Sequence, residues 1–185
     1  MEGRRARRWD AHLSVPDRPD ELFVVVDEHG EPIGTATRAA CHSDPSLVHL
    51  SVHVVVLAHG GVLWQLRGPY KDSAPSTWDH ACSGHVSAGE GVRDAAVREL
   101  AEEVGIEVAD DDLEELTRAR CALEGETELT TVFRVRHAGP YRLAPPELAG
   151  LVVLPVGERP APLSPSCALL TGVLDAEHPG WDDGP

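Results

Sequence analysis

The chain has 185 residues with 42% hydrophobic side chains, enough for one globular domain with its own core. Its formal net charge of −15 repels polyanions, which argues against nucleic acid and anionic membranes as partners. No apolar run approaches the length of a membrane span. The four cysteines are scattered without a paired motif, which is typical of reduced thiols in a cytoplasmic protein.

The first half of the chain predicts two strand pairs after a polar start. Residues 1–20 are rich in arginine with no apolar segment behind them, so we expect a disordered arm rather than a signal peptide. Strands are predicted at residues 21–27 and 33–37, around a turn. A β-branched run at 51–58 predicts a core strand, and two glycines then turn the chain into a strand at 62–67. A loop rich in Gly, Pro and Ser follows at 68–77.

Residues 91–104 change to a helical composition. Val92, Ala96, Leu100 and Val104 fall on one stripe at helical spacing, and Gly105 is a natural stop. Further strands are predicted at 106–108, 116–123, 129–136 and 151–156, and a last helix from Ser164-Pro165 to about residue 175. We therefore predict a single domain over residues 21–176 and a disordered tail over 177–185.

The helix at 91–104 carries the strongest chemical signal in the chain. Glu99 and Glu103 are four residues apart and Glu102 is beside Glu103, so the three carboxylates converge on one side of a helix. Like charges packed this closely repel each other unless a cation neutralises them, and hard oxygen ligands suit Mg²⁺ or Mn²⁺. Arg98 can pair with Glu90 and hold the preceding loop against the helix. The plain alternative is a solvated acidic helix face.

Residues 84–106 match every specified position of the Nudix box, G-x5-E-x7-R-E-U-x-E-E-x-G-U with U apolar. The chain thus resembles the Nudix superfamily, which implies an α/β fold, an α/β/α sandwich around a mixed central sheet. The resemblance also implies metal-assisted attack of water on a diphosphate linkage. By that resemblance Glu99, Glu102 and Glu103 are the metal-binding and catalytic carboxylates, and we include Glu90 in the metal-binding set.

Residues 22–170 also resemble a branch of that superfamily, the type 1 isopentenyl-diphosphate isomerases. The shared segments are the hairpin GEPIGTATRAACH, a second histidine seven residues later, the Gly-His pair at 84–85, and Glu-Thr-Glu in GETELTTVF. In the isomerases three histidines and two glutamates of this kind hold a divalent metal. The resemblance therefore implies a second site for Mn²⁺ or Zn²⁺. Its residues here are His42, His49, His85, Glu126 and Glu128.

The same resemblance places three basic residues where the isomerases hold the diphosphate. These residues are Arg38, Arg67 and Lys71. Each of them could be a plain surface charge if taken alone. Together they would supply a local positive pocket within an acidic chain that has only 16 Lys and Arg.

The chain departs from the isomerases at the acid that protonates carbon. Ser83 stands where they have a cysteine, and Cys82 precedes it on what would be the opposite face of an extended segment. We find no tyrosine in the stretch just before Glu126, and Ser166 stands where the family has tryptophan, so the aromatic shield of a carbocation is also missing. Ser83 and Glu128 complete our candidate catalytic residues.

Three functions remain open at this point. We favour a hydrolase that cleaves a small organic or nucleoside diphosphate, because the carboxylate helix is complete whereas the isomerase acid is not. An isopentenyl-diphosphate isomerase in which Ser83, Cys82 or water replaces the acid is the second. A non-catalytic ligand sensor is the third. A small-molecule diphosphate is the expected partner, and the sequence does not distinguish a monomer from a homodimer.

Overall fold

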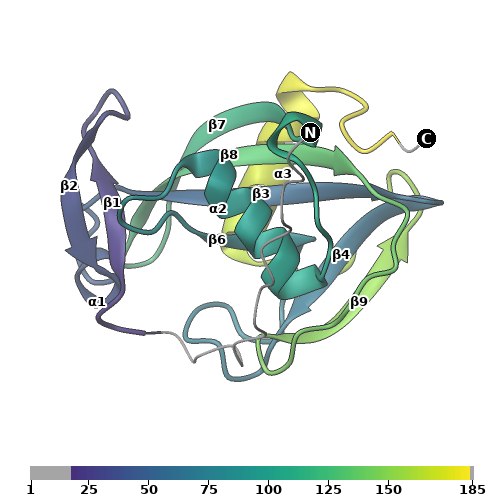
Figure 1. Cartoon of the computed structure of the whole chain (residues 1–185), viewed down its shortest axis with the longest axis horizontal. Coiled ribbons are helices and arrows are strands. Elements are labelled where there is room, and N and C mark those ends of the chain that lie inside the picture. Colours follow the sequence, from purple (N-terminus) through teal and green to yellow (C-terminus); the bar gives the residue numbers. More distant parts are fainter. Residues whose placement is uncertain (1–17, 184–185) are drawn as a thin grey trace, which may run out of the picture.

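The computed structural model describes residues 18–183 as a mixed sheet with helices on both faces (Figure 1). Residues 1–17 of the expected arm and residues 184–185 of the expected tail lie outside the described residues. The strands are β1 (Leu22–Val26), β2 (Pro32–Thr37), β3 (His49–Ala58), β4 (Gly61–Arg67), β5 (Trp78–His80), β6 (Cys82–His85), β7 (Glu114–Ala122), β8 (Thr127–Arg136) and β9 (Leu148–Leu154). The helices are α1 (Arg38–Cys41), α2 (Val92–Glu99) and α3 (Pro165–Glu177).

Strand β3 is the centre of the sheet. It pairs antiparallel with β1, β4 and β6, and parallel with β8 along most of its length. Strand β7 continues the sheet beyond β8, while β5 and β9 both pair with β4. All ten residues of β3 are buried, as expected for a β-branched strand covered on both faces.

The two faces of β3 have separate cores because side chains alternate along a strand. Val52, Val54 and Val56 point to the α2 side, where they pack with Ala96 and Leu100. The residues between them point to the α3 side, where the core includes Cys167, Leu170 and Leu174. Helix α2 lies in front of the sheet and α3 behind it (Figure 1). The predicted α/β/α sandwich with a mixed central sheet is therefore confirmed.

The helix continues directly beyond Glu99, the last residue of α2, as a π-helical turn over Leu100–Val104. Asp94 accepts a hydrogen bond from the N–H of Gly91 at the start of α2, and Gly105 ends the π turn in the left-handed conformation with φ 70. Glu102 and Glu103 both lie in this π turn, a local geometry that is frequent at functional sites.

Two short strands and one short helix escaped the sequence analysis. Strands β5 and β6 contain only three and four residues, and polar residues and Gly84 interrupt their pattern. Helix α1 contains four residues and begins at the N-cap Thr37, whose hydroxyl accepts a hydrogen bond from the N–H of Ala40. Each element is too short to establish a hydrophobic period of its own.

The strand predicted at residues 106–108 is not observed. Ile106 is buried, but its N–H donates to the carbonyl of Leu100 and so closes the π turn instead of joining the sheet. A 3-10 turn over Asp110–Asp112 follows before β7 begins. The alternation of Ile106 and Val108 therefore reflects packing against the core rather than a strand.

The chain after α3 folds back onto the domain, where the sequence analysis expects a disordered tail. Trp181 is only 2% exposed and packs in the core beneath α3. Its indole Nε1–H donates to Asp175 at 2.8 Å, and Arg134 donates to its carbonyl. The tail is polar in composition, but one large apolar side chain is enough to anchor it.

We predict that Trp181→Ala lowers the free energy of unfolding by about 3–5 kcal/mol, because it removes a large buried side chain and leaves a cavity. Urea unfolding followed by far-ultraviolet circular dichroism measures this change. Tyr70→Ala is the matched control, since Tyr70 is 88% exposed and its removal leaves no cavity. Equal stability of the two variants would show that the tail is not anchored by Trp181.

Candidate functional site

One cavity of about 1150 Å³ collects most of the side chains singled out in the sequence. It lies on the α3 side of the sheet, and the carboxylates at the end of α2 reach its rim. Of the predicted residues, those that line it are Arg38, His42, Arg67, Lys71, Ser83, His85, Glu99, Glu102, Glu103, Glu126 and Glu128. His49 and Glu90 are absent from this lining among the described residues.

Arg98 organises the carboxylates of the helix. Its guanidinium donates two hydrogen bonds to Glu90, at 2.8 and 3.0 Å, and further ones to Glu99 at 2.6 Å and Glu102 at 3.2 Å. The N–H of Ser87 also donates to Glu90. Both oxygens of Glu90 therefore accept hydrogen bonds from Arg98 or the loop, and Glu90 does not line the cavity; its place in the metal-binding set stays a prediction.

Glu103 is buried and held on one oxygen by two donors. Gln65 Nε2 and the backbone N–H of Ser83 donate to its Oε2 at 3.0 and 3.1 Å. Burial and the neighbouring Glu99 raise the pKa of Glu103 well above its usual value, and burial raises that of Glu99 to about 7. Two carboxyls that resist ionisation side by side become a strong ligand pair once a divalent cation offsets their charge.

Gly84 allows this close approach between strand and helix. A Cβ atom at position 84 would overlap the carboxyl of Glu99, so any larger residue would displace that side chain. The glycine of the sequence motif thus has a steric role, because it lets β6 pass beneath the carboxylates.

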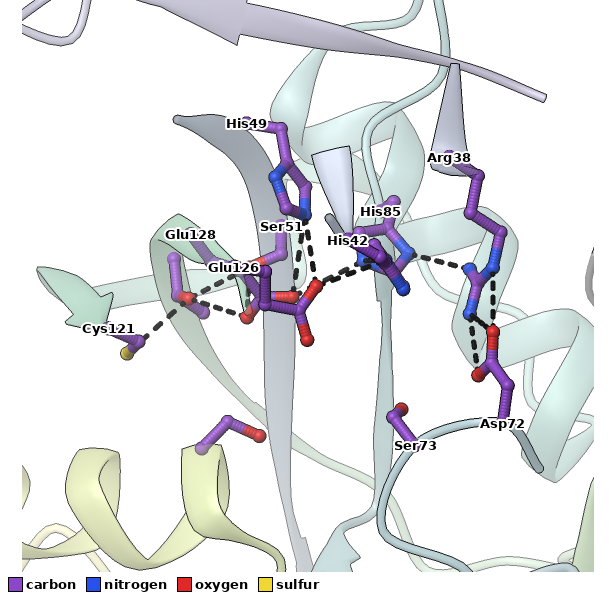
Figure 2. A network of polar contacts seen from close by, with 12 residues as sticks. Arg38, His42, His49, Ser51, Asp72, Ser73, His85, Cys121, Glu126 and Glu128 are labelled. Atoms are coloured by element: carbon purple, nitrogen blue, oxygen red, sulfur yellow. Dashed lines mark hydrogen bonds and ion pairs between the residues drawn. The ribbon is translucent and has the colours of Figure 1, made fainter. Parts of the chain in front are cut away.

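The three predicted histidines and two predicted glutamates form a second cluster (Figure 2). His42 Nε2 lies 3.1 Å from Glu126, and His85 Nε2 lies 3.2 Å from Glu128. His49 Nε2 lies 3.8 Å from both glutamates. His49, His85 and Glu128 come from β3, β6 and β8, whereas His42 directly follows α1 and Glu126 directly precedes β8. His49 and Glu128 are neighbours in the parallel β3–β8 ladder.

This second cluster fits a divalent cation on its own chemistry. His49 Nε2 is buried and makes no hydrogen bond, and Glu126 Oε2 accepts none, although both point into the cluster (Figure 2). Burial lowers the pKa of His42 and His85 to about 4, so their rings are neutral and have a lone pair available. Burial opposes ionisation of Glu128, but the hydrogen bond from His85 lowers its pKa to about 2. A buried unpartnered nitrogen beside carboxylates is a site that a metal ion would complete.

The three basic residues lie around the same cavity, and each is oriented by an acidic partner. Arg38 forms a two-pronged contact with Asp72 at 2.9 to 3.2 Å (Figure 2). Arg67 donates to Asp79 at 3.3 Å, and Lys71 Nζ lies 3.9 Å from Glu147. These pairs hold the three basic groups at the wall of the cavity. Phosphate oxygens of a ligand could accept hydrogen bonds from them there.

Ser83 and Cys82 face opposite sides of the sheet, as expected for an extended segment. Ser83 lines the cavity, whereas Cys82 is fully buried in the core on the α2 side. Burial raises the pKa of the Cys82 thiol well above its usual value. Cys82 is therefore shielded from any ligand in the cavity, and no tyrosine or tryptophan is among the described residues that line it.

The sequence analysis missed several polar residues that support the site. Gln65 holds Glu103, Asp72 orients Arg38, and Ser51 donates to Glu128 at 3.2 Å. A further group comprises His53, which lines the cavity wall, and Asp79 and His80, which lie behind it. The period of β3 could have revealed Ser51 and His53, because they follow His49 at two-residue steps and so share its face.

The NUDIX domain family model matches residues 47–166, more than half of the chain, so the chain belongs to the Nudix family. An isopentenyl-diphosphate Delta-isomerase from Mycolicibacterium vanbaalenii is 30% identical over 174 residues, covering 88% of this chain and 96% of that protein. The same enzyme from Cutibacterium acnes is 39% identical over 90 residues, covering 48% of this chain and 45% of that protein. Several other curated isomerases also match over only about half their length.

Solved structures agree on the fold. DR0079 from Deinococcus radiodurans superposes with a TM-score of 0.59 at 22% identity, covering 85% of this chain and 91% of that one. The NUDIX domain of Shewanella oneidensis NrtR, solved with ADP ribose, gives a TM-score of 0.55 at 15% identity, covering 76% of this chain and 92% of that one. Identities this low establish the shared architecture and leave the reaction open. Among residues 18–183, no helix is long and apolar enough to span a membrane.

We predict that cation binding at the histidine–glutamate cluster releases a proton from Glu126. Burial and the charge of Glu128 raise the pKa of Glu126 to about 7, so the carboxyl is largely protonated at pH 6 and must ionise to bind a metal. Mn²⁺ affinity should therefore rise between about pH 6 and 8 and level off above that range. His42 and His85, with pKa values near 4, stay neutral across this window.

Calorimetric titration with Mn²⁺ in two buffers of different ionisation enthalpy counts the released protons. The Glu99→Gln, Glu103→Gln double variant is the proper background, because it removes the other carboxyls with raised pKa. Adding Glu126→Gln should abolish the proton release. Mn²⁺ affinity that does not change with pH in the double variant would contradict the assignment.

Proposed function

We propose that this chain is a divalent-metal-dependent hydrolase that cleaves a diphosphate linkage in a small organic or nucleoside diphosphate. The observation that carries the proposal is the joint placement of the motif glutamates and the basic residues around one cavity. Relatives of this fold include a domain solved with ADP ribose, a compound in which a diphosphate joins two larger groups.

The basic residues bind the substrate in this proposal. A chain with a net charge of −15 repels a diphosphate at long range, so attraction must arise locally. Arg38 and Arg67 offer planar donors suited to phosphate oxygens, and Lys71 adds a mobile point charge. Their acidic partners keep the donor groups at the wall, so that little side-chain freedom is lost on binding.

The motif glutamates hold the metal ion in this proposal. Glu99, Glu102 and Glu103 would hold Mg²⁺ or Mn²⁺, which supplies charge neutralisation at the phosphates and acidifies a bound water. Arg98 orients Glu99 and Glu102, while Gln65 and the Ser83 N–H orient Glu103. The pKa of Glu99, which burial raises to about 7, suits a carboxyl that accepts a proton from water near neutral pH.

We predict that Glu103→Gln reduces hydrolysis by more than about 100-fold, since loss of a partner outside the metal's own ligands already costs 10–100-fold. Phosphorus NMR with Mg²⁺ should follow ADP ribose, nucleoside diphosphates and isopentenyl diphosphate. Glu107→Gln makes the same charge change at an exposed position outside the cavity and should keep full activity. The proposal fails if no substrate of this panel is cleaved, or if Glu103→Gln is as active as Glu107→Gln.

Isomerisation of isopentenyl diphosphate is the second candidate, favoured by the histidine–glutamate cluster and by the curated relatives. The cavity wall argues against it, because Ser83 is a far weaker acid than a thiol and no tyrosine or tryptophan of the described residues lines the cavity to shield a cation.

We therefore predict that the native chain forms no dimethylallyl diphosphate and that any isomerase activity appears only in Ser83→Cys. Proton NMR of isopentenyl diphosphate with Mg²⁺ and Mn²⁺ measures the new methyl signals. Ser166→Cys places a thiol elsewhere on the same cavity wall and controls for a nonspecific effect of cysteine. Dimethylallyl signals from the native chain would overturn the choice of hydrolysis.

A further inference from the structure

A third group of ionisable side chains lies between the sheet and α3. His53 comes from β3, and Asp79 and His80 come from β5; they are 3%, 0% and 0% exposed. His53 lines the cavity wall, whereas Asp79 and His80 lie behind it. None of the three belongs to the glutamate group of the helix or to the histidine–glutamate cluster. In the proposed hydrolysis only Asp79 has a role, as the partner that holds Arg67.

Three potential ligand atoms converge in this group. His53 Nδ1 lies 3.1 Å from His80 Nδ1 and 3.2 Å from Asp79 Oδ1. In a tetrahedral zinc site with bonds of about 2.0–2.2 Å, the ligand atoms are about 3.3–3.5 Å apart. Both separations are therefore within a few tenths of an ångström of the spacing around a bound zinc ion.

The outward-facing atoms of the same residues are already fixed by neighbours. His80 Nε2 lies 3.2 Å from the hydroxyl of Thr171 on α3, which leaves Nδ1 directed at His53. Asp79 Oδ2 accepts from Ser164 at 3.1 Å and from Arg67 at 3.3 Å. Partners of this kind set the tautomer of a metal-binding histidine and the orientation of a metal-binding carboxylate.

The charge state of the group also suits a cation. Burial lowers the pKa of His80 to about 3, so its ring is neutral and its nitrogens are available as ligands. Burial opposes ionisation of Asp79, but His53 and Arg67 hold its pKa below the usual range, so it is a carboxylate. Arg67 repels a metal ion, yet it binds Oδ2 and leaves Oδ1 on the side of the histidines.

We propose that His53, Asp79 and His80 form a zinc site separate from the histidine–glutamate cluster, with a fourth position for water on the cavity side. Two imidazoles and one carboxylate are a donor set that zinc accepts. Because the ligands join β3 to β5 next to Thr171, which lies in the middle of α3, the ion would connect the cavity wall to that helix. The proposal does not depend on the hydrolytic function.

The direct test is a zinc titration of the native chain followed by long-range proton–nitrogen NMR of the imidazole rings. Single His→Gln variants assign the signals. We expect the Nδ1 signals of His53 and His80 to move to the range of metal-bound nitrogen. Unchanged Nδ1 signals of both residues at saturating Zn²⁺ would overturn the site and leave the three side chains as a hydrogen-bonded group.

Zinc content by elemental analysis after dialysis provides a second measurement. His80→Gln should lose one equivalent relative to the native chain, and adding His42→Gln should lose one more from the other cluster. His59→Gln, at an exposed position, is the matched control and should keep both. Equal zinc content in His80→Gln and His59→Gln contradicts the proposal.

Thr171→Val covers the case in which the buried His80→Gln variant does not fold. It preserves the volume of the side chain and removes only the hydroxyl beside His80 Nε2. Zinc affinity at the site should then fall by about 10–100-fold. An unchanged zinc affinity together with unmoved Nδ1 signals in the native chain rejects the site, whatever the outcome of the hydrolysis assay.

Discussion

The contacts of one guanidinium hold the motif together. Arg98 donates to Glu90, Glu99 and Glu102 and to the backbone carbonyl of His85. It thereby connects the loop before α2, the helix itself and strand β6, which carries the cavity residues Ser83, Gly84 and His85. The carboxylates repel one another, and the half-buried guanidinium among them offsets that repulsion without a metal. The placement of the helix against the sheet depends on this interaction as much as on the apolar stripe behind it.

The centre of the fold follows from local pattern. The β-branched run of β3 predicts a buried strand, and the helical stripe with its glycine stop predicts α2, because in both cases side-chain periodicity and burial agree. The family and its mixed sandwich could thus be predicted. The ends of elements could not: the π turn, the missing strand after Gly105 and the anchored Trp181 depend on tertiary contacts with partners far along the chain.

The site was predictable only where a residue belongs to a spaced motif. The motif indicates Glu99, Glu102 and Glu103, and the family resemblance indicates the histidine–glutamate cluster, whose convergence the structure displays without testing its function. Gln65 and Asp72 have no such spacing, so only their three-dimensional contacts with Glu103 and Arg38 reveal them. Ser51 shares the face of His49 by the two-residue period of β3, but its hydrogen bond to Glu128 appears only in the fold. Glu90 belongs to the same motif, yet its oxygens bind Arg98 and the Ser87 N–H and it does not line the cavity.

The contact between Ser83 and Glu103 runs through the backbone N–H rather than through the serine hydroxyl. The hydrogen bond that orients the buried carboxyl therefore survives any substitution at position 83 that preserves the strand. The side chain there can change while the anchoring of the Glu103 carboxyl stays the same. A substitution at position 83 can therefore add or remove a proton donor at one wall of the cavity while the contacts of Glu103 stay unchanged. Few substitutions then separate two related reactions on the same fold.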